Sequence, residues 1–504
     1  MAERKTLMLR SPRKRASRST HGSGPHPMTF PPYHLTRRRL LQGGLALSAF
    51  GLALSRLPAA FAQNAEPRLL TAGPGEARLL EAGQPATRTW LYDGVSPGPT
   101  LRARQGEEVF VRLVNNLPQP TTIHWHGIRI DNAMDGVPHL TQHAVAPGES
   151  FDYRFTVPDA GTFWYHPHDR SWEQMARGLY GLLIVEEPEP AEGIRDFAIV
   201  ADDWRLGEDG QIDEASFGNM MDWSHAGRLG NTLTLNGQDL LEILVRHNAY
   251  MRLRLCNTCN ARVLELRIEH PGIQLVALDG QPVEPRELTD GYIRLAPGER
   301  ADLLIHFYRE PGSTAAITEV SGGQRLEAGR FVYHPTDRVI HRSEPHLRLP
   351  ANPLSTDLDL GNALAVELLM EGGAMGSLAQ AMHNGEMKDI RSLVGEGMAW
   401  SLNGVAGMTE APLFTAARGR TVTADLTNDT RWPHAIHFHG HHFSVLERDG
   451  QATNDDAWKD TVLIDPQKTA KIAFVADNPG KWMIHCHMLE HQASGMTTWF
   501  NVEA

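Results

Sequence analysis

Short stretches in which apolar and polar residues alternate recur along most of the chain. Three of them are EEVFVRLVNNLP (107–118), ESFDYRFTVPDAG (149–161) and KIAFVADNPGKW (471–482), which contain or end in Pro, Gly or Asn. A two-residue period places side chains alternately on the two faces of a β-strand, and turn residues between such runs are typical of antiparallel sandwiches. Because no long helical period interrupts them, the pattern predicts an all-β fold with Greek-key connections.

Two segments without any period divide this pattern into three parts. EEPEPAEG (186–193) is acidic and rich in proline, and HPTDRVIHRSEPHLRLPANPLS (334–355) contains four prolines. Segments of this composition read as linkers. We therefore predict three consecutive β-sandwich domains, over residues 66–188, 194–340 and 356–504.

An internal repeat relates the first and third predicted domains. FTVPDAGTFWYHPH (155–168) aligns without gaps to FVADNPGKWMIHCH (474–487), and upstream IHWHG (123–127) matches IHFHG (436–440). A repeat of this kind indicates copies of one structural unit. In the second predicted domain LELRIEHPG (264–272) stands where the His-x-His would be, so we expect no metal ligands there.

The first 62 residues have the character of an export signal. Arg37 and Arg38 precede an apolar run from Leu40 to Leu54, and Ala60-Phe61-Ala62 follows as a small-x-small ending. This order is that of a twin-arginine secretory signal. A membrane anchor is the alternative, but the run is short and contains glycine.

From this signal we expect a disordered basic leader and signal peptide over residues 1–62, with translation starting at Met1 or at Met28. We also expect export to the periplasm by the twin-arginine translocation machinery, with no stable membrane insertion. The mature chain is expected to be a monomer.

Charge and cysteine content narrow the function further. The formal net charge is −12 although the leader is basic, so the remainder is more acidic still and should repel nucleic acid.

Two of the three cysteines, Cys256 and Cys259, form the motif CNTC. A disulfide or a metal clip is one interpretation in an exported protein, and two small residues at the end of a strand is the one we favour.

Histidine is the residue type that changes the picture most. The chain has 25 histidines, and they include four His-x-His pairs. On a β-strand both imidazoles of such a pair point to one face, and neutral imidazole is a good ligand for Cu, Zn, Fe and Ni. Eight imidazoles exceed the needs of one ion, so a multinuclear cluster between the first and third domains is predicted. The pairs are His124/His126, His166/His168, His437/His439 and His485/His487.

The stretch HCHMLEHQASGM (485–496) adds a second kind of site. Cys486 lies between two histidines, so its thiolate should point away from them, toward His491 and His434, with Met496 as a weak axial ligand. Two His, one Cys and a distant Met are the ligands of a blue-copper electron-transfer site. His485 and His487 are bonded to Cys486 along the chain, which gives electrons a covalent path into the cluster.

These motifs resemble those of the three-domain multicopper oxidases of the laccase type. HWHG, WYHPH, PHAIHFHGH and HCHMLEHQASGM match the family's four copper motifs in order, and the resemblance extends over residues 66–504. It implies cupredoxin-like domains, four copper ions, and an oxidoreductase that passes four single electrons from a reductant to dioxygen, which becomes water.

The resemblance also implies a role for each ligand. The type 1 copper would be held by His434, Cys486, His491 and Met496. The type 2 copper would be held by His124 and His437. The type 3 pair would be held by His126, His166, His168, His439, His485 and His487.

Oxygen reduction also consumes protons. Asp135 matches a carboxylate beside the cluster in bacterial relatives, although a turn residue before Gly136 is the alternative. Gln492 departs from the family, because many bacterial members carry a titratable Glu there. Asp135 is therefore the expected proton carrier, together with water or another acid. His441 and His442 are expected on the surface or behind the ligands.

The electron donor is the least constrained feature. Six methionines fall between Met370 and Met408, and thioethers bind Cu(I), as in cuprous oxidases of the family. The segment is sparse in histidine, however, and Thr430 and Trp432 stand where those enzymes carry Asp and Met. We favour a phenol or aromatic amine, with Cu(I) as the alternative.

A periplasmic protein that sequesters copper without turnover is an alternative from another class. Storage does not require a thiolate flanked by histidines of a separate cluster, so Cys486 argues against it.

Overall fold

The computed structural model describes residues 66–81, 83–189, 191–340, 347–453 and 456–504. The predicted leader and signal peptide lie outside the described residues. Half of the chain is strand and only 8% is helix, so the all-β prediction is confirmed. Among the described residues no helix is both long and apolar enough to cross a membrane.

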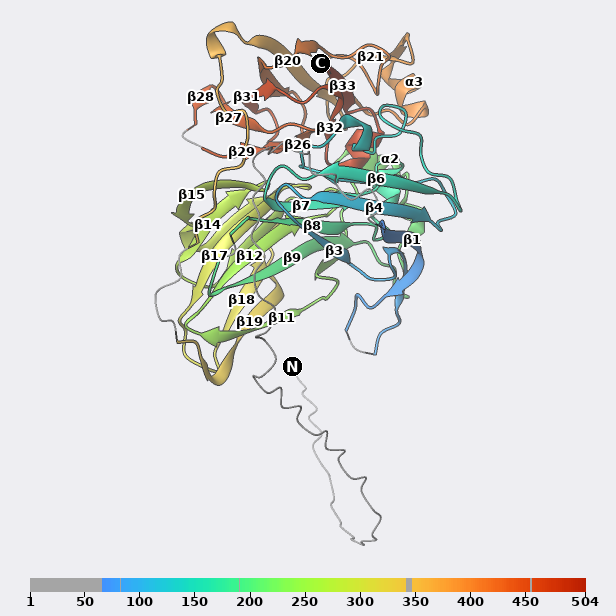
Figure 1. The fold of residues 1–504 in the computed structure, drawn as a ribbon. Helices are drawn as coiled ribbons and strands as arrows, with labels where there is room; N and C mark the ends of the chain where they lie inside the picture. Colours follow the sequence, from blue (N-terminus) through green and yellow to red (C-terminus); the bar gives the residue numbers. More distant parts are fainter. Residues whose placement is uncertain (1–65, 82, 190, 341–346, 454–455) are drawn as a thin grey trace, which may run out of the picture. The chain divides into compact units, whose positions relative to one another are not determined.

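The strands form three pairs of sheets, which we call domains 1, 2 and 3 in chain order (Figure 1). Domain 1 contains a sheet in the order β2-β1-β4-β6 and a second in the order β3-β8-β7-β5. Their bounds are β1 (Arg68–Ala77), β2 (Thr87–Tyr92), β3 (Gly98–Arg104), β4 (Glu108–Asn115), β5 (His124–His126), β6 (Ser150–Thr156), β7 (Gly161–His166) and β8 (Gly181–Glu186). The short helices are η1 (Asn132–Met134) and α1 (Ser171–Gln174).

Domain 2 contains the sheets β10-β9-β12-β17-β14-β15 and β11-β19-β18-β13-β16. The first consists of β9 (Ile194–Trp204), β10 (Thr232–Leu235), β12 (Ala249–Asn257), β14 (Ile273–Leu278), β15 (Gln281–Glu287) and β17 (Arg300–Phe307). The second consists of β11 (Leu241–His247), β13 (Leu264–Ile268), β16 (Tyr292–Leu295), β18 (Thr314–Glu319) and β19 (Leu326–Arg338). The helices are η2 (Glu214–Ser216), α2 (Met220–Ser224), η3 (Thr289–Gly291) and η4 (Ser321–Gly323).

Domain 3 contains the sheets β23-β20-β25-β31-β27-β28, with β29 paired to β27, and β24-β33-β32-β26-β30. The first consists of β20 (Leu364–Gly372), β23 (Trp400–Leu402), β25 (Arg420–Asn428), β27 (Phe443–Arg448), β28 (Gln451–Ala452), β29 (Trp458–Lys459) and β31 (Thr469–Ala476). The second consists of β24 (Thr415–Ala417), β26 (His434–Phe438), β30 (Thr461–Ile464), β32 (Gly480–Cys486) and β33 (Thr497–Glu503). A hairpin of β21 (Gln380–His383) and β22 (Glu386–Asp389) and the helices η5 (Leu360–Asn362), α3 (Ile390–Gly395) and α4 (Leu489–Ala493) complete it.

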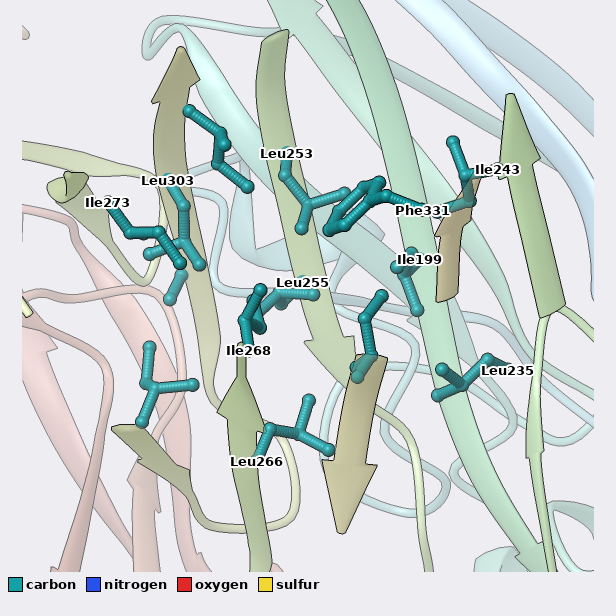
Figure 2. Packing of buried hydrophobic residues seen from close by; sticks show 14 of the residues in the cluster. Ile199, Leu235, Ile243, Leu253, Leu255, Leu266, Ile268, Ile273, Leu303 and Phe331 are labelled. Carbon is teal, nitrogen blue, oxygen red and sulfur yellow. The ribbon is translucent and has the colours of Figure 1, made fainter. Parts of the chain in front are cut away.

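Each sandwich has its own apolar core between its sheets. In domain 2, alternate residues of β12 and β17 such as Leu253 and Leu303 face Leu266 and Phe331 from the opposing sheet, as Figure 2 shows. Burying such side chains stabilises the fold by roughly 2 kcal/mol each, which is the reason for the two-residue period in the sequence.

A fourth apolar cluster joins domains 1 and 2 and includes one residue of domain 3, Leu489 of α4. It contains Trp164 of β7, Ile184 of β8 and Trp204 of β9, together with Cys256 and Leu489. Because β7 and β8 are covered on both faces, nearly all of their residues are buried, and they read as continuous apolar runs. Cys256 and Cys259 are both buried free thiols, so they form no disulfide.

Candidate metal centres

The four His-x-His pairs lie on four strands of domains 1 and 3. In domain 1, β5 pairs with β7 and places His124 directly opposite His166. In domain 3, β26 pairs with β32 in the same way and places His437 opposite His485. The second histidine of the β5 pair, His126, is the last residue of β5. The second histidines of the other three pairs lie one or two residues beyond the ends of β7, β26 and β32. All eight side chains are buried.

The eight imidazoles converge in groups of three whose ring nitrogens lie within 4.8 Å of one another. Each group combines histidines of domain 1 with histidines of domain 3. Two of the groups have no residue in common, and the third shares His126 with the first. The groups are His126, His166 and His487; His168, His439 and His485; and His124, His126 and His437.

Hydrogen bonds to main-chain carbonyls fix the orientation of several rings. The Nδ1 of His124 lies 2.8 Å from the Asp135 carbonyl oxygen, and the Nδ1 of His437 lies 2.8 Å from that of Asp460. The Nδ1 of His166 lies 2.9 Å from the Pro167 carbonyl oxygen. Because a carbonyl only accepts, each Nδ1 carries the proton and each Nε2 presents a lone pair.

The remaining nitrogens fit a metal ion. The Nε2 atoms of His124, His166 and His437 are buried and have no hydrogen-bond partner. The Nε2 of His485 lies 3.1 Å from the Nε2 of His439. Both rings donate through Nδ1, so two lone pairs face each other, an arrangement that a cation between them would relieve. Unsatisfied buried acceptors are costly in protein interiors, whereas imidazole is a good ligand for copper.

Burial favours the neutral form of five of these imidazoles. It lowers the pKa of His166, His168 and His485 well below the usual range, and the neighbouring histidines lower it further. The same causes act on His439 and His487. Neutral rings are the form that a metal ion requires.

A separate group on the other side of β32 consists of His434, Cys486 and His491. The Cys486 Sγ lies 3.6 Å from the Nδ1 of His434 and 3.8 Å from the Nδ1 of His491, and these two nitrogens lie 3.1 Å apart. The Cys486 amide donates to the carbonyl oxygen of Met496. The side chains of Cys486 and Met496 are both fully buried in the apolar core of domain 3. Burial raises the pKa of the Cys486 thiol to about 12, so a bound cation is needed to ionise it at neutral pH.

The outer nitrogens of this group are bonded to protein. The Nε2 of His491 donates to the carbonyl oxygen of His225, at 2.8 Å, and the Nε2 of His434 lies 2.9 Å from the Thr430 hydroxyl. The ring of His225 packs against Trp432, with centroids 5.2 Å apart. A segment of domain 2 therefore covers the mononuclear site of domain 3, which the sequence pattern gave no reason to expect.

Asp135 lies beside the multinuclear site. It follows η1, which Asp131 caps, and precedes Gly136, so it is a turn residue as well as a neighbour of the site. Its carboxylate is 3.0 Å from the Nδ1 of His439 and 3.2 Å from the Nδ1 of His124, and its side chain is buried.

Asp460 is a second buried carboxylate at the site and was not identified from the sequence. Its Oδ1 lies 3.1 Å from the Nε2 of His126, and its Oδ atoms accept two hydrogen bonds from Arg300. Burial would raise the pKa of Asp460, but the Arg300 guanidinium and His126 hold it well below the usual range. No repeat or spacing marks Asp460 or Arg300, since the first is 23 residues beyond His437 and the second belongs to domain 2.

The remaining candidates lie around these groups. Gln492 is buried and accepts a hydrogen bond from Ser171. Glu490 accepts one from Asn260, and its carboxyl pKa is raised by burial. His441 and His442 are buried, not on the surface, and burial lowers the pKa of both to about 4.

The methionine-rich segment forms ordered structure. It contains the hairpin β21–β22 and the helix α3, which pack around a small core of Ala381, Leu393 and Ala406. Met370 is buried in the core of domain 3, whereas Met375 and Met387 are exposed.

Comparison with known proteins adds independent findings. Family models described as multicopper oxidase match residues 76–190, 195–325 and 379–504. The chain is 29% identical over 463 residues to multicopper oxidase MmcO of Mycobacterium tuberculosis. The alignment covers 85% of this chain and 86% of that protein.

Solved structures agree with these matches. A multi-copper oxidase from Pseudomonas thermotolerans superposes with a TM-score of 0.74 at 33% identity, covering 87% of this chain and 99% of that one. A laccase-like multi-copper oxidase, CueO, from the lignin-degrading bacterium Ochrobactrum sp. superposes with a TM-score of 0.71 at 26% identity, covering 86% and 99%. The structure of that protein is described together with its oxidase activity towards lignin model compounds and lignosulfonate.

Proposed function

Because the chain belongs to the multicopper oxidase family, whose members bind four copper ions, we propose that it oxidises an organic reductant one electron at a time and reduces dioxygen to water. The observation that carries this proposal is the placement of Cys486, which faces His434 and His491 while its chain neighbours His485 and His487 face the multinuclear group.

The ligands divide between two sites. We assign the type 1 copper to His434, Cys486, His491 and Met496; the type 2 copper to His124 and His437; and the type 3 pair to His126, His166 and His487 on one side and His168, His439 and His485 on the other. When bound, the copper ions supply the single-electron acceptor and the four-electron reduction of dioxygen.

The polypeptide provides the connection between the sites. Cys486 is bonded through the main chain to His485 and His487, so these residues would provide two short covalent paths from the ligands of the type 1 copper to the ligands of the cluster. The hydrogen bond of 2.9 Å between the Nδ1 of His485 and the carbonyl oxygen of Cys486 shortens one of these paths further. Cys486, His485 and His487 are therefore the residues of electron transfer.

We assign proton supply to Asp135. Its carboxylate is the acid that touches His124 and His439 and is not paired with an arginine in the ion pairs of the described chain. Gln492 cannot titrate, so the route that a glutamate at this position would offer is absent. We therefore assign the protons to Asp135, together with water or another acid.

An organic reductant is favoured over Cu(I). The hydrogen-bonding partner of His434 is the hydroxyl of Thr430, a poor ligand for a soft metal. The ring of Trp432 packs against that of His225, which bonds the other histidine of the group. One of the six methionines, Met370, is in the domain core and cannot reach solvent copper. Phenols and aromatic amines can stack on the indole and the imidazole of His225.

We also propose that the mature protein is a periplasmic monomer, exported through the twin-arginine machinery. The support for this is the signal sequence that begins at Thr36 and the acidic composition of the remainder.

The test is oxygen uptake by the copper-loaded protein without its signal, with a methoxyphenol and with chelated Cu(I) at matched driving force. Faster uptake with the phenol is expected. Faster uptake with Cu(I) would identify a cuprous oxidase and make the exposed methionines its substrate site. Full copper occupancy without uptake from either donor would favour copper sequestration.

A further inference from the structure

The two carboxylates of the multinuclear site are related by a reciprocal arrangement. The carbonyl oxygen of Asp135 accepts from His124 of its own domain, and its carboxylate accepts from His439 of domain 3. The carbonyl oxygen of Asp460 accepts from His437 of its own domain, at 2.8 Å, and its carboxylate lies 3.1 Å from His126 of domain 1. Each aspartate thus orients one proposed type 2 ligand and one proposed type 3 ligand.

The two aspartates differ in what holds them. The Nη1 and Nη2 atoms of Arg300 lie 2.9 Å and 2.7 Å from the two carboxylate oxygens of Asp460, which is a bidentate pair. Arg300 is the first residue of β17 in domain 2, and its side chain is completely buried. Its Nε donates to the carbonyl oxygen of Thr162 in domain 1, so this one guanidinium contacts all three domains.

The neighbouring main chain is shaped around this pair. Gly127, which follows His126, has φ of 82°, and a Cβ there would collide with both Arg300 and Asp460. The carbonyl oxygen of Gly298, two residues before Arg300, accepts from its Nη1. A Cβ on Gly298 would lie 3.0 Å from the His126 ring. The glycine that ends the motif HWHG is therefore required by the guanidinium that reaches it from domain 2.

We infer that Asp460 and Arg300 are positioning residues of the trinuclear site: Arg300 holds the Asp460 carboxylate, and Asp460 holds the rings of His126 and His437 at the angle that copper requires. Domain 2 thus controls a metal site to which it contributes no ligand. The inference rests on the copper assignment proposed above.

A purely structural role is the competing explanation, because the same region docks domain 3 on domain 2. Lys459, adjacent to Asp460, lies 2.9 Å from Glu299 and 3.3 Å from Asp279, both of domain 2. In these pairs the cation belongs to domain 3 and the carboxylates to domain 2, whereas in the Arg300–Asp460 pair the cation belongs to domain 2 and the carboxylate to domain 3. Among the described residues no hydrogen bond or ion pair joins Lys459 to a proposed copper ligand, so it provides a control for the docking of domain 3 on domain 2.

The experiment compares Arg300→Gln, Arg300→Lys, Asp460→Asn and Lys459→Gln in the copper-loaded full chain. Copper per chain, the electron paramagnetic resonance spectrum of the type 2 copper, the blue absorption of the type 1 copper and the thermal midpoint are measured. Loss of an outer hydrogen-bond partner lowers metal affinity by about 10–100-fold. We expect this loss in Arg300→Gln and Asp460→Asn. The type 2 spectrum should also change, because the Asp460 Oδ1 lies 3.4 Å from the Nδ1 of His437 as well as 3.1 Å from the Nε2 of His126. Arg300→Lys should be intermediate, because lysine keeps the charge but not the bidentate geometry.

Lys459→Gln is expected to lower the thermal midpoint and to leave the type 2 spectrum unchanged. An identical spectral change in Lys459→Gln and Arg300→Gln would overturn the inference in favour of docking. If the single variants do not fold, the double variant Arg300→Gln/Asp460→Asn decides, since it leaves no unpaired buried charge. A wild-type spectrum and copper affinity in that double variant would also overturn it. Failure of the copper assignment would be seen earlier, as a missing blue band in the unmodified protein.

Discussion

Single residues set the chemistry here through the two nitrogens of each imidazole. In His124, His166 and His437, one nitrogen is committed to a main-chain carbonyl and the other has no protein partner. Such outer hydrogen bonds fix the tautomer and the ring angle before a metal ion arrives. Cys486 shows the complementary case, because its pKa is raised by burial and only a cation can make it a thiolate.

The substitution Cys486→Ser tests electron entry. Serine is nearly isosteric, so the fold should be retained, but a hydroxyl does not replace a thiolate as a ligand for blue copper. The blue absorption should disappear, and oxygen uptake should fall by at least about a hundredfold. The type 2 resonance should persist as the internal control. Retention of turnover without the blue band would show that electrons enter elsewhere.

The substitution Asp135→Asn tests proton supply. Asparagine can still accept from His439 through its carbonyl oxygen, so copper content should stay close to wild type. General acid–base residues contribute about 10²–10⁴-fold, and oxygen uptake should fall within that range. The rate in deuterated water, compared with wild type, is the measurement. An unchanged rate with full copper would assign proton delivery to another group.

The grouping of the candidate ligands could be predicted, because their spacing along each strand determines which side chains share a face. A His-x-His on a strand places two rings on one face, and the order HCH places a thiol on the other, so local geometry is sufficient. Arg300 and His225 could not be predicted, because each reaches the sites from domain 2 through contacts that no short motif records. Asp460 could not be predicted because it lies 23 residues beyond His437 and no repeat marks it. The surface location considered for His441 and His442 was wrong, because the chain after β26 turns inward.

Short elements, rather than long ones, position the side chains of the multinuclear site. The single turn η1 and Gly136 aim Asp135, and β5, with only three residues, carries two of the proposed ligands. Gly136 has φ of 79°, and a Cβ there would collide with the carbonyl of Ile123, the residue before His124. The turn and the strand are therefore packed against each other without space for a side chain.

The substitution Gly136→Ala should destabilise the fold by about 3 kcal/mol, because it combines a left-handed backbone with a steric collision. Gly148→Ala is the matched control: Gly148 has φ of 83°, but nothing lies within 4 Å of its Cβ position. That control should cost only about 1 kcal/mol. Denaturant titration measures both, and equal losses would show that packing against Ile123 is unimportant.

His270, in the loop between β13 and β14, makes the folding stability of domain 2 depend on pH. Burial lowers the pKa of His270 to about 4, and its Nε2 lies 2.8 Å from the Tyr333 hydroxyl. The unfolded chain, with a pKa near 6.5, binds the proton first as pH falls, so stability decreases between pH 6.5 and 4.

In His270→Gln this loss should be smaller by about 1 kcal/mol between pH 7 and pH 5, allowing for solvent screening. Denaturant unfolding of domain 2 at the two pH values is the measurement. Parallel pH dependence in the variant and the wild type would contradict the assignment.

At the scale of the whole molecule, the interfaces differ in kind. Domains 1 and 2 share an apolar cluster that includes Trp164 and Trp204. Domains 1 and 3 meet at eight histidines and at Asp135 and Asp460, and they are also joined by a hydrogen bond from Asn132 to the Lys481 carbonyl oxygen and by the ion pair of Arg129 with Asp477. The buried imidazoles gain stability mainly when a metal ion satisfies their free nitrogens. Copper is therefore expected to contribute much of the attachment between domains 1 and 3.

Removal of copper with a chelator should lower the thermal midpoints of domains 1 and 3 by about 10 °C or more, because a ligand present at a large excess over its Kd stabilises by about 4 kcal/mol. Domain 2, whose core lies almost entirely within residues 199–333, should change least. Differential scanning calorimetry with and without copper tests this. Equal shifts in all transitions would mean that the domains unfold as one unit.

The crossing of Asp135 and Asp460 also bears on ancestry. Each aspartate contacts a histidine of its own domain and a histidine of the other. This exchange resembles the contacts of two copies of one domain around a twofold axis, although Asp135 lies 11 residues and Asp460 lies 23 residues after the histidine of its own domain that it contacts. A single-domain ancestor could have formed the same site as a homodimer. Gene fusion would then have allowed the two halves to diverge, so that Asp460 pairs with an arginine and, among the described residues, Asp135 does not.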